Sequence, residues 1–243
     1  MLKHVSNFDM QLFYLPELEK NSQIATFSKE ESKHIFKVLR KKVGDLLSIT
    51  NGKNLLFSGK IKSISKSNCE VQILNCIEEN ELDYSLHIAI SCLKSNERFE
   101  WFLEKASEIG ITEISPLICD RSERKFINEK RLKKVLVSAM KQSLKTHLPV
   151  LNQLTRLKDF MKRKSDDQLF IAHCNDSKKN PLLKSIKPKS KITILIGPEG
   201  DFTECEVEEA LKAGFKPVSL GNSRFRAETA AIIASHTVSI TNM

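Results

Sequence analysis

The order of predicted strands and helices constrains the fold of this chain more than any other feature of its sequence. After about residue 80, short apolar strands alternate with amphipathic helices. The strands are expected at 85–93, 111–118, 168–173, 191–196 and 216–220, and the helices at 97–109, 128–145, 203–213 and 227–238. This alternation is typical of a largely parallel sheet with helices on its faces. The later part of the chain is therefore predicted to form an α/β domain.

The residues before this alternation carry a β-rich pattern. Short runs such as LLSI, LLFSGKIKSI and CEVQIL are separated by turn residues. Asn51-Gly52, between two of these runs, suits a two-residue hairpin turn because glycine accepts a positive φ. One helix is expected over Ser28–Leu39, where Ser28 begins a sequence with the spacing of a capping box. A small barrel with one helix fits this part, and the acidic stretch 78–83 is the candidate linker.

The charge is concentrated in one stretch of the chain. The whole sequence has 39 Lys and Arg against 30 Asp and Glu, a net charge of +9. Between Arg121 and Lys164 there are 14 basic and 3 acidic residues, a net charge of +11. Concentrated positive charge attracts a phosphate backbone through counterion release, which indicates a nucleic-acid partner. A lysine-rich surface that only keeps the protein soluble remains the alternative.

Other patterns exclude several classes of protein. The apolar runs are too short to span a bilayer, and the first residues lack the apolar core of a signal peptide, so we expect a cytoplasmic protein with no membrane partner. The six cysteines form no CxxC pair and no cluster with zinc-ligand spacing, so no metal is predicted. GxGxxG and GxxxxGK[ST] motifs are absent, which disfavours a nicotinamide enzyme and a P-loop ATPase.

Two strands of the predicted sheet end in glycine-bearing turns. ILIGPEGDFT runs from a strand into Gly197 and then a helix, and VSLGNSRFRAETAA runs from a strand into Gly221 and then the last helix. Ligands of open α/β sheets bind at the carboxyl ends of strands, where glycines let backbone amides approach closely. GPEG also fits a plain turn. The glycines alone therefore leave two interpretations open, a ligand-binding site and a structural turn.

The block from Ile196 to Ala231 resembles the signature of the RsmE family of 16S rRNA uridine-N3 methyltransferases, which belong to the SPOUT class. That signature is I/L-GPEGG followed by LG-x-x-x-L-R-x-ET-A, and this chain matches it at Gly197, Pro198, Glu199, Gly200, Leu220, Gly221, Arg226, Glu228, Thr229 and Ala230. Blocks around HIFKVLRKKVGD, KSNERFEWFLEKASEIG and AMKQSLKTHLPVL are also similar to the family. The resemblance covers about residues 11–239.

The chain departs from the family pattern at several positions. Asp201 stands where the family usually has a second Gly, and Ser223 stands where many members have Arg. Ala227 replaces a usual Thr, and Lys141 replaces a usual Glu. These departures bear on the details of cofactor contact and RNA docking. They bear less on the reaction, because the core Gly, Arg and Glu positions are kept.

The resemblance implies a homodimer with two domains in each subunit. Residues 10–77 would be a PUA-like RNA-binding barrel, 78–84 a linker, and 85–243 a SPOUT α/β domain with a trefoil knot that holds S-adenosylmethionine near the subunit interface. Residues 1–9 would be a disordered extension or the product of an upstream start codon. The implied substrate is one uridine of 16S rRNA within the small ribosomal subunit.

The resemblance also implies a set of site residues. The expected cofactor-binding residues are Leu195, Ile196, Gly197, Pro198, Glu199, Gly200, Leu220, Gly221, Arg226, Glu228 and Thr229. The expected RNA-binding residues are Arg40, Lys41, Lys42, Lys94, Arg121, Arg124, Lys134, Lys141 and Lys145. Four lysines of the predicted helix 128–145 lie on the arc opposite its apolar face, and we expect them to form one continuous RNA surface with the basic residues of the first domain; they are Lys130, Lys134, Lys141 and Lys145.

Methylation at uridine N3 needs an electrophilic methyl group and loss of the imide proton. Arg226 is the candidate for stabilising the charge that spreads onto the ring carbonyls, with a phosphate contact or a pair with Glu228 as alternatives. Glu199 could contact the cofactor, assist deprotonation or brace the GPEG turn, and Glu228 is a third candidate catalytic residue. His34, His147 and His173 are available as bases, but the sequence assigns none of them.

Two other functions compete with this interpretation. The first is another SPOUT methyltransferase, acting on a ribose 2′-OH or on tRNA, which would share the knot and the cofactor. The second is a non-catalytic rRNA-binding protein that uses the same basic surface. The intact GPEG and RAET blocks argue against the second, because binding alone does not require two glycine-lined strand ends.

Overall fold

The protein, described here from a computed structural model, divides into two compact units. The structure describes residues 11–163, 165–175 and 178–243. Among these residues, the first unit contains 11–81 together with 140–148, and the second contains the described parts of 82–139 and 149–243. The extension expected at residues 1–9 lies outside the described residues. The sequence predicted one boundary between the domains, at 78–84, whereas residues 140–148 also belong to the first unit.

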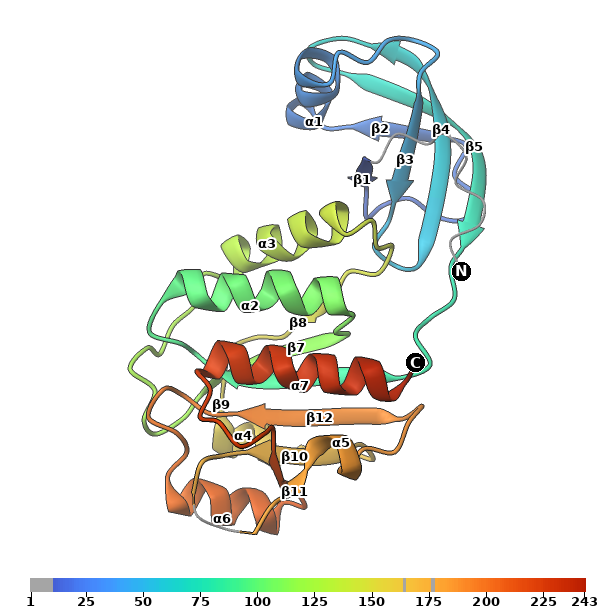
Figure 1. Ribbon diagram of the computed structural model, residues 1–243. Helices are drawn as coiled ribbons and strands as arrows, with labels where there is room; N and C mark the ends of the chain where they lie inside the picture. Colours follow the sequence, from blue (N-terminus) through green and yellow to red (C-terminus); the bar gives the residue numbers. More distant parts are fainter. Residues whose placement is uncertain (1–10, 164, 176–177) are drawn as a thin grey trace. The chain divides into compact units, whose positions relative to one another are not determined.

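A five-stranded sheet forms most of the first unit (Figure 1). Its strands, in the order β1-β3-β4-β5-β2, are antiparallel except for β1 with β3. The elements of this unit are β1 (Leu12–Tyr14), β2 (Ile24–Phe27), α1 (Lys29–Lys33), the π-helical turn η1 (His34–Val38), β3 (Leu46–Thr50), β4 (Leu55–Ile64) and β5 (Cys69–Glu78). Phe13, Ile35 and Phe57 belong to its buried apolar core.

Two local predictions for this unit need correction. The helix expected over Ser28–Leu39 is a short α-helix that continues as the π-helical turn, although Ser28 does cap it by accepting a hydrogen bond from the Glu31 amide at 3.3 Å. The turn between β3 and β4 has four residues rather than two, since β3 ends at Thr50 and β4 begins at Leu55. Both Gly52 and Asn54 have positive φ in this longer turn.

Residues 140–148 join the first unit through backbone contacts with the β3–β4 turn. The carbonyl of Thr146 accepts from the Asn54 amide at 3.0 Å, and the Leu148 amide donates to the Gly52 carbonyl at 2.9 Å. A Cβ at Gly52 would stand 2.9 Å from the Tyr14 ring and 3.1 Å from the Leu148 Cβ. Glycine is therefore required at position 52, because both the backbone conformation and the available space exclude a side chain.

The second unit contains an eight-stranded sheet whose paired strands are all parallel, as the alternation of strands and helices predicts. The strand order is β11-β13-β10-β12-β6-β7-β8, and β9 pairs with β7. The strands are β6 (Ser85–Ser91), β7 (Glu113–Ile118), β8 (Val150–Leu151), β9 (Thr155–Arg156), β10 (Gln168–Ala172), β11 (Asn180–Pro181), β12 (Lys191–Ile196) and β13 (Lys216–Ser219). The helices are α2 (Asn96–Ile109), α3 (Glu129–Gln142), α4 (Leu157–Met161), α5 (Leu182–Ser185), α6 (Glu204–Lys212) and α7 (Ala227–Thr241).

Helices cover this sheet as the apolar pattern requires. Leu195 and Ile171 on one face pack with residues of α4 and α6 in a buried apolar cluster. Because successive side chains of a strand alternate between faces, Ile194 belongs to the opposite face. There α7 contacts β6 and β12 and runs beside α2 (Figure 1). Thr203 and Glu206 form a capping box at the start of α6.

Candidate active site

Three neighbouring parallel strands end at the same edge of the sheet. β10 pairs with β13 on one side and with β12 on the other. The loops that follow these strands therefore meet, although 22 or more residues separate the end of one strand from the end of the next along the chain. Two of these loops carry the glycine-bearing turns found in the sequence, and the third follows Ala172.

A cavity of about 790 Å³ lies at this edge. Seven of the eleven expected cofactor-binding residues line it: Ile196, Gly197, Pro198, Glu199, Leu220, Gly221 and Arg226. Further lining residues come from the loops after β10 and β12 and from the segment before α7, among them His173, Lys179, Asp201, Arg224 and Phe225. Its size lies within the range of pockets that enclose small-molecule ligands, roughly 300–1,000 Å³.

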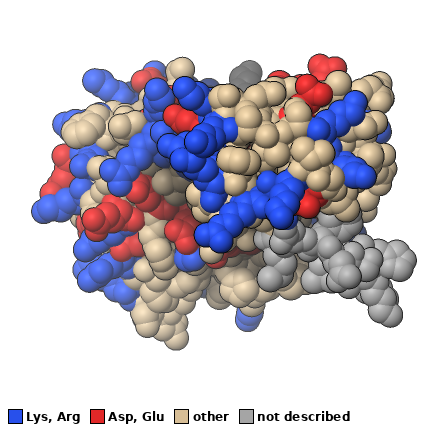
Figure 2. All heavy atoms as spheres, turned by 90° about the horizontal axis from the view of Figure 1, so that it is seen from above, with Lys and Arg blue, Asp and Glu red and all other residues tan. Residues whose placement is uncertain are grey.

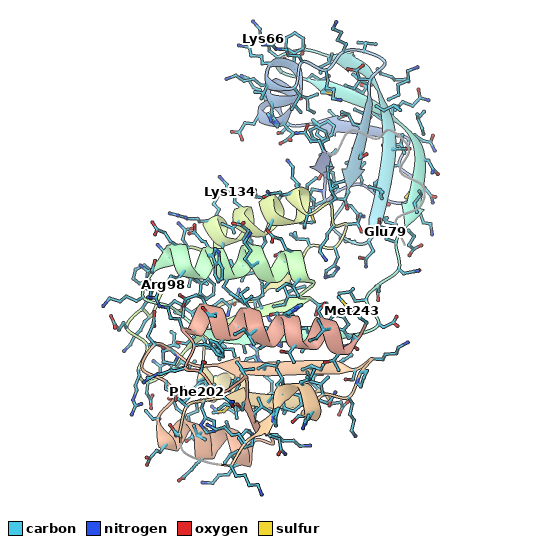
Figure 3. The ribbon with its side chains drawn as sticks, viewed as in Figure 1. Lys66, Glu79, Arg98, Lys134, Phe202 and Met243 are labelled. Carbon is cyan, nitrogen blue, oxygen red and sulfur yellow. The ribbon has the colours of Figure 1, made fainter. Side chains whose placement is uncertain are left out.

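Two glycines shape the edges of the cavity for different physical reasons. A Cβ at Gly197 would stand 3.0 Å from the ring of Phe202, which is fully buried (Figure 3). Gly221 has a φ of +145°, a conformation that L side chains rarely adopt. Close packing thus requires glycine at position 197, and backbone conformation requires it at position 221.

Carboxylates tie the loop after β12 to its neighbours. Glu199 Oε1 accepts a hydrogen bond from the Lys94 backbone amide at 3.0 Å, which links this loop to the segment after β6. Asp201 Oδ2 accepts from the Cys174 amide at 2.7 Å, which links it to the segment after β10. Glu199 therefore braces the GPEG turn, one of the roles considered for it, while it also lines the cavity.

Asp201 occupies a backbone conformation that favours glycine. Its φ is +62°, which explains why glycine is usual at this position in the family that the sequence resembles. Asp and Asn tolerate this region better than most residues because their short side chains bond locally. Here Asp201 Oδ1 accepts from the Phe202 amide at 2.8 Å. The hydrogen bonds of the carboxylate thus offset the cost of the conformation.

Arg226 and Glu228 lie in different environments, although both begin the last helix. Arg226 is exposed at the N-cap of α7 and lines the cavity, and no side-chain partner is found for it among the described residues. Glu228 is 5% exposed, lies outside the cavity lining, and pairs with Arg98 of α2 at 3.7 Å between Oε1 and Nε. The ion pair considered between Arg226 and Glu228 is replaced by this one.

Leu195, Gly200 and Thr229, like Glu228, were expected at the cofactor site and do not line the cavity. Leu195 is fully buried in the cluster with α4 and α6, so only its backbone faces the sheet edge. Gly200 turns toward Arg121, whose Nη1 donates to the Gly200 carbonyl at 2.9 Å. A Cβ at Gly200 would meet Arg121 at 3.5 Å, an ordinary contact, so space does not require glycine there.

His173 is a site residue that sequence reasoning left unassigned. It follows β10, is 9% exposed and lines the cavity, and neither ring nitrogen has a hydrogen-bond partner among the described residues. Burial lowers the pKa of the His173 imidazole, the Lys179 ammonium lowers it further, and the Asp201 carboxylate opposes them. A lone histidine after a strand carried no sequence signal for this placement. His34, by contrast, is half-exposed and pairs with Glu31 at 3.6 Å in the first unit.

The expected RNA-binding residues fall into two groups. Some make contacts within the protein: Arg121 holds the Gly200 carbonyl, Arg124 bonds Asn96 and stacks on Phe126, Lys94 pairs with Glu123, and Lys141 pairs with Glu31. Others are exposed, including Arg40, Lys42 and Lys134, the last on α3 (Figure 3). Figure 2 shows a face of the molecule on which Lys and Arg side chains are prominent among the charged residues.

The arc of four lysines on the predicted helix 128–145 needs correction. Because α3 ends at Gln142, Lys145 cannot share its arc. Lys145 is half-buried, and burial lowers the pKa of its ammonium. Lys141 also belongs to the first unit, where it pairs with Glu31. Of the four expected lysines, Lys130 and Lys134 are the two that are exposed on α3 within the second unit.

Comparison with known families agrees with this geometry. The family model of the RNA methyltransferase domain matches residues 80–239, and the family model of the RNA methyltransferase PUA domain matches residues 27–74. Within the described residues, no helix is long and apolar enough to cross a membrane.

Similar proteins and structures cover nearly the whole chain. Ribosomal RNA small subunit methyltransferase E of Rickettsia conorii is 31% identical over 92% of this chain and 92% of its own. A probable rRNA-methyltransferase from Porphyromonas gingivalis has a TM-score of 0.87 at 35% identity, covering 95% of this chain and 98% of its own. Ribosomal RNA small subunit methyltransferase E from Neisseria gonorrhoeae, solved bound to S-adenosyl methionine, has a TM-score of 0.82 at 28% identity, covering 93% and 95%.

The two matched domains and the cavity at the strand ends define the class of this protein, an RNA methyltransferase with a PUA domain. Within that class, the chain belongs to the ribosomal RNA small subunit methyltransferase E family. This is the RsmE family that the glycine-bearing turns and the RAET block resemble, so that prediction is confirmed.

Proposed function

We propose that the protein transfers a methyl group from S-adenosylmethionine to N3 of one uridine in 16S rRNA. The observation that carries this proposal is the cavity at the ends of β10, β12 and β13, which brings Gly197, Gly221 and Arg226 together. The relatives named ribosomal RNA small subunit methyltransferase E support an rRNA substrate. An rRNA substrate in turn supports a cytoplasmic reaction with the small ribosomal subunit as the partner.

The residues at the cavity fit S-adenosylmethionine. The Neisseria gonorrhoeae relative was solved with that cofactor. In this chain, the backbones at Ile196, Gly197, Leu220 and Gly221 offer amides and carbonyls to a nucleoside, with no side chain at the two glycines to block its approach. His173 adds two ring nitrogens that have no partner within the described part of the chain and that lie on the cavity wall. When bound, the cofactor supplies an electrophilic methyl group on a sulfonium.

The residues of the chain would act on the uridine. N3 lies on the pairing edge of the base, so the nucleotide must be unpaired or extruded to reach the cavity. As the imide proton passes to solvent, negative charge spreads onto the ring carbonyl oxygens, and the exposed guanidinium of Arg226 can donate to them. Glu199 holds the turn beside the cavity through the Lys94 amide, so its primary role is positioning.

Glu228 would contribute by orienting α7. Its carboxylate is buried and pairs with Arg98, and removal of one partner leaves an uncompensated buried charge. Because Glu228 lies in the first turn of α7, its pairing with α2 fixes the helix start that presents Arg226. This positioning role replaces the catalytic role considered for Glu228 from the sequence.

Two further features of the family resemblance belong to the proposal. The chain leaves β13 and returns across β10 to pack α7 on β12 and β6, a path that supports a knotted C-terminal segment. α7 is rich in small apolar residues, which supports burial against a second copy in a twofold dimer. Sedimentation at micromolar concentration tests the dimer, and a monomeric mass would contradict it.

Replacement of Lys130 and Lys134 by Ala is expected to weaken RNA binding and to flatten its salt dependence by roughly one unit of slope per lost phosphate contact. Both lysines are exposed on α3, so their removal costs no internal contact among the described residues. Affinity for S-adenosylmethionine should stay at the parental value. Filter binding across a range of salt concentrations measures the slope, and an unchanged slope would mean that these lysines only keep the protein soluble.

The proposed function is tested by mass spectrometry of small-subunit rRNA from cells with and without the gene. We expect one N3-methyluridine to disappear from 16S rRNA on deletion and to return with the parental gene. Loss of a ribose 2′-O-methyl group or of a tRNA modification would instead indicate another member of the class. Calorimetry with S-adenosylmethionine separates an enzyme from a protein that only binds rRNA.

A further inference from the structure

His173 is buried against the cavity with unused hydrogen-bonding capacity. The residue is 9% exposed, and both Nδ1 and Nε2 lack a partner among the described residues. A buried polar group without a partner is costly, and such groups are rare in folded proteins unless a ligand, a water or a catalytic role accounts for them. Since His173 lines the cavity, a bound molecule there can supply the missing hydrogen bond.

Two neighbouring side chains hold the backbone at His173 in place. Lys179 Nζ donates to the carbonyl of His173 at 2.7 Å and to that of Asn175 at 2.6 Å. The amide of the same peptide group, at Cys174, donates to Asp201 Oδ2 at 2.7 Å. The peptide group between His173 and Cys174 is thereby held at both its carbonyl and its amide, which is the arrangement expected for a preorganised binding residue.

The charges around the cavity favour an uncharged imidazole. Lys179 comes from the loop after β10, Arg224 and Arg226 from the segment before α7, and Glu199 and Asp201 from the loop after β12. Both carboxylates already accept backbone hydrogen bonds. Burial and Lys179 hold the pKa of His173 below the ordinary value of 6.5, so the ring is neutral at pH 7 and can both donate and accept.

We propose that His173 is a direct binding residue of the cofactor site, whose neutral imidazole forms a hydrogen bond with the polar part of a bound S-adenosyl nucleoside. This inference rests on the proposed function, because it takes the cavity to be the cofactor site. It adds a side-chain contact to a site that is otherwise formed largely by backbone, and it gives Asp201 a function in a position where glycine is usual.

Calorimetry of the full-length protein with S-adenosylmethionine and with S-adenosylhomocysteine tests the proposal. His173→Leu should weaken binding of both by about tenfold, the loss of one buried hydrogen bond together with its desolvated partner. His173→Asn and His173→Gln carry an amide near the places of Nδ1 and Nε2, and one of them should recover most of the affinity. His34→Leu, in the first unit, is the matched control and should leave affinity unchanged.

The pH dependence of binding provides a second readout. Since the neutral ring binds, parental affinity should fall as the pH drops through the pKa of His173, below 6.5. The variant that recovers affinity should lack this fall. Parental affinity in His173→Leu, or an identical pH profile in the recovering variant, would overturn the inference while leaving the proposed function intact. Absence of binding by the parental protein would instead refute the proposed function.

Discussion

Gly221→Val is expected to abolish measurable binding of S-adenosylmethionine and leave the folded structure intact. A β-branched residue cannot readily adopt the φ of +145° found at Gly221, so the loop before α7 must change its conformation in this variant. That loop carries Phe225, 3.6 Å from the position of an added Cβ, and Arg226 on the cavity wall. We expect a loss of affinity greater than about a hundredfold, or roughly 3 kcal/mol.

The fold should survive because Gly221 is exposed and follows the last residue of β13 by two positions. Circular dichroism and thermal melting measure this, and calorimetry measures the affinity. Gly200→Ala is the matched control. Gly200 does not line the cavity, and an added Cβ there makes only an ordinary 3.5 Å contact with Arg121. If Gly221→Val bound the cofactor with parental affinity, the cavity would not be the cofactor site.

Local patterns were enough to predict the architecture of the second unit. Apolar strands of four to seven residues and amphipathic helices are encoded within short windows, and the structure has them in the predicted order. The short strands β8, β9 and β11 were not predicted. Strands of two residues exist only through pairing with β7 and β13, which no local window reveals.

Tertiary contacts explain where the sequence interpretation of the first unit failed. The end of α3 and the segment after it join that unit through Thr146 and Leu148, which bond a turn more than ninety residues earlier in the chain. Since no composition change marks this return, a single linker at 78–84 was the natural prediction. The π-helical turn after α1 likewise has no signal in the residue pattern.

In the candidate site too, residues within sequence motifs were predicted, whereas roles that depend on tertiary contacts were not. Gly197, Gly221 and Arg226 were predicted because each belongs to a motif that follows a strand, and all three line the cavity. Glu228 lies in the same motif, yet its side chain turns to Arg98, a residue 130 positions earlier. His173 lies in no recognised motif, and its significance comes from burial and from the absence of a partner among the described residues.

Arg226→Ala is expected to lower kcat by a hundredfold or more, on the order of the loss caused by removing one donor that stabilises a developing anion. Because Arg226 is exposed and has no side-chain partner among the described residues, its removal leaves no buried group unsatisfied. Melting temperature should therefore stay close to the parental value. Single-turnover methylation of small-subunit RNA, at saturating cofactor and enzyme, measures the chemical step.

The division between kcat and KM separates the two roles of this arginine. A donor to the uridine carbonyls acts in the transition state, so its loss lowers kcat and leaves the KM for RNA nearly unchanged. A phosphate contact binds substrate and transition state equally, so its loss raises KM with kcat unchanged. Arg226→Lys keeps the charge but lacks the planar fork of donors, and it should restore RNA binding in the second case and little activity in the first. A raised KM with parental kcat in Arg226→Ala would assign Arg226 to RNA binding and leave the charge on the uridine without a donor from α7.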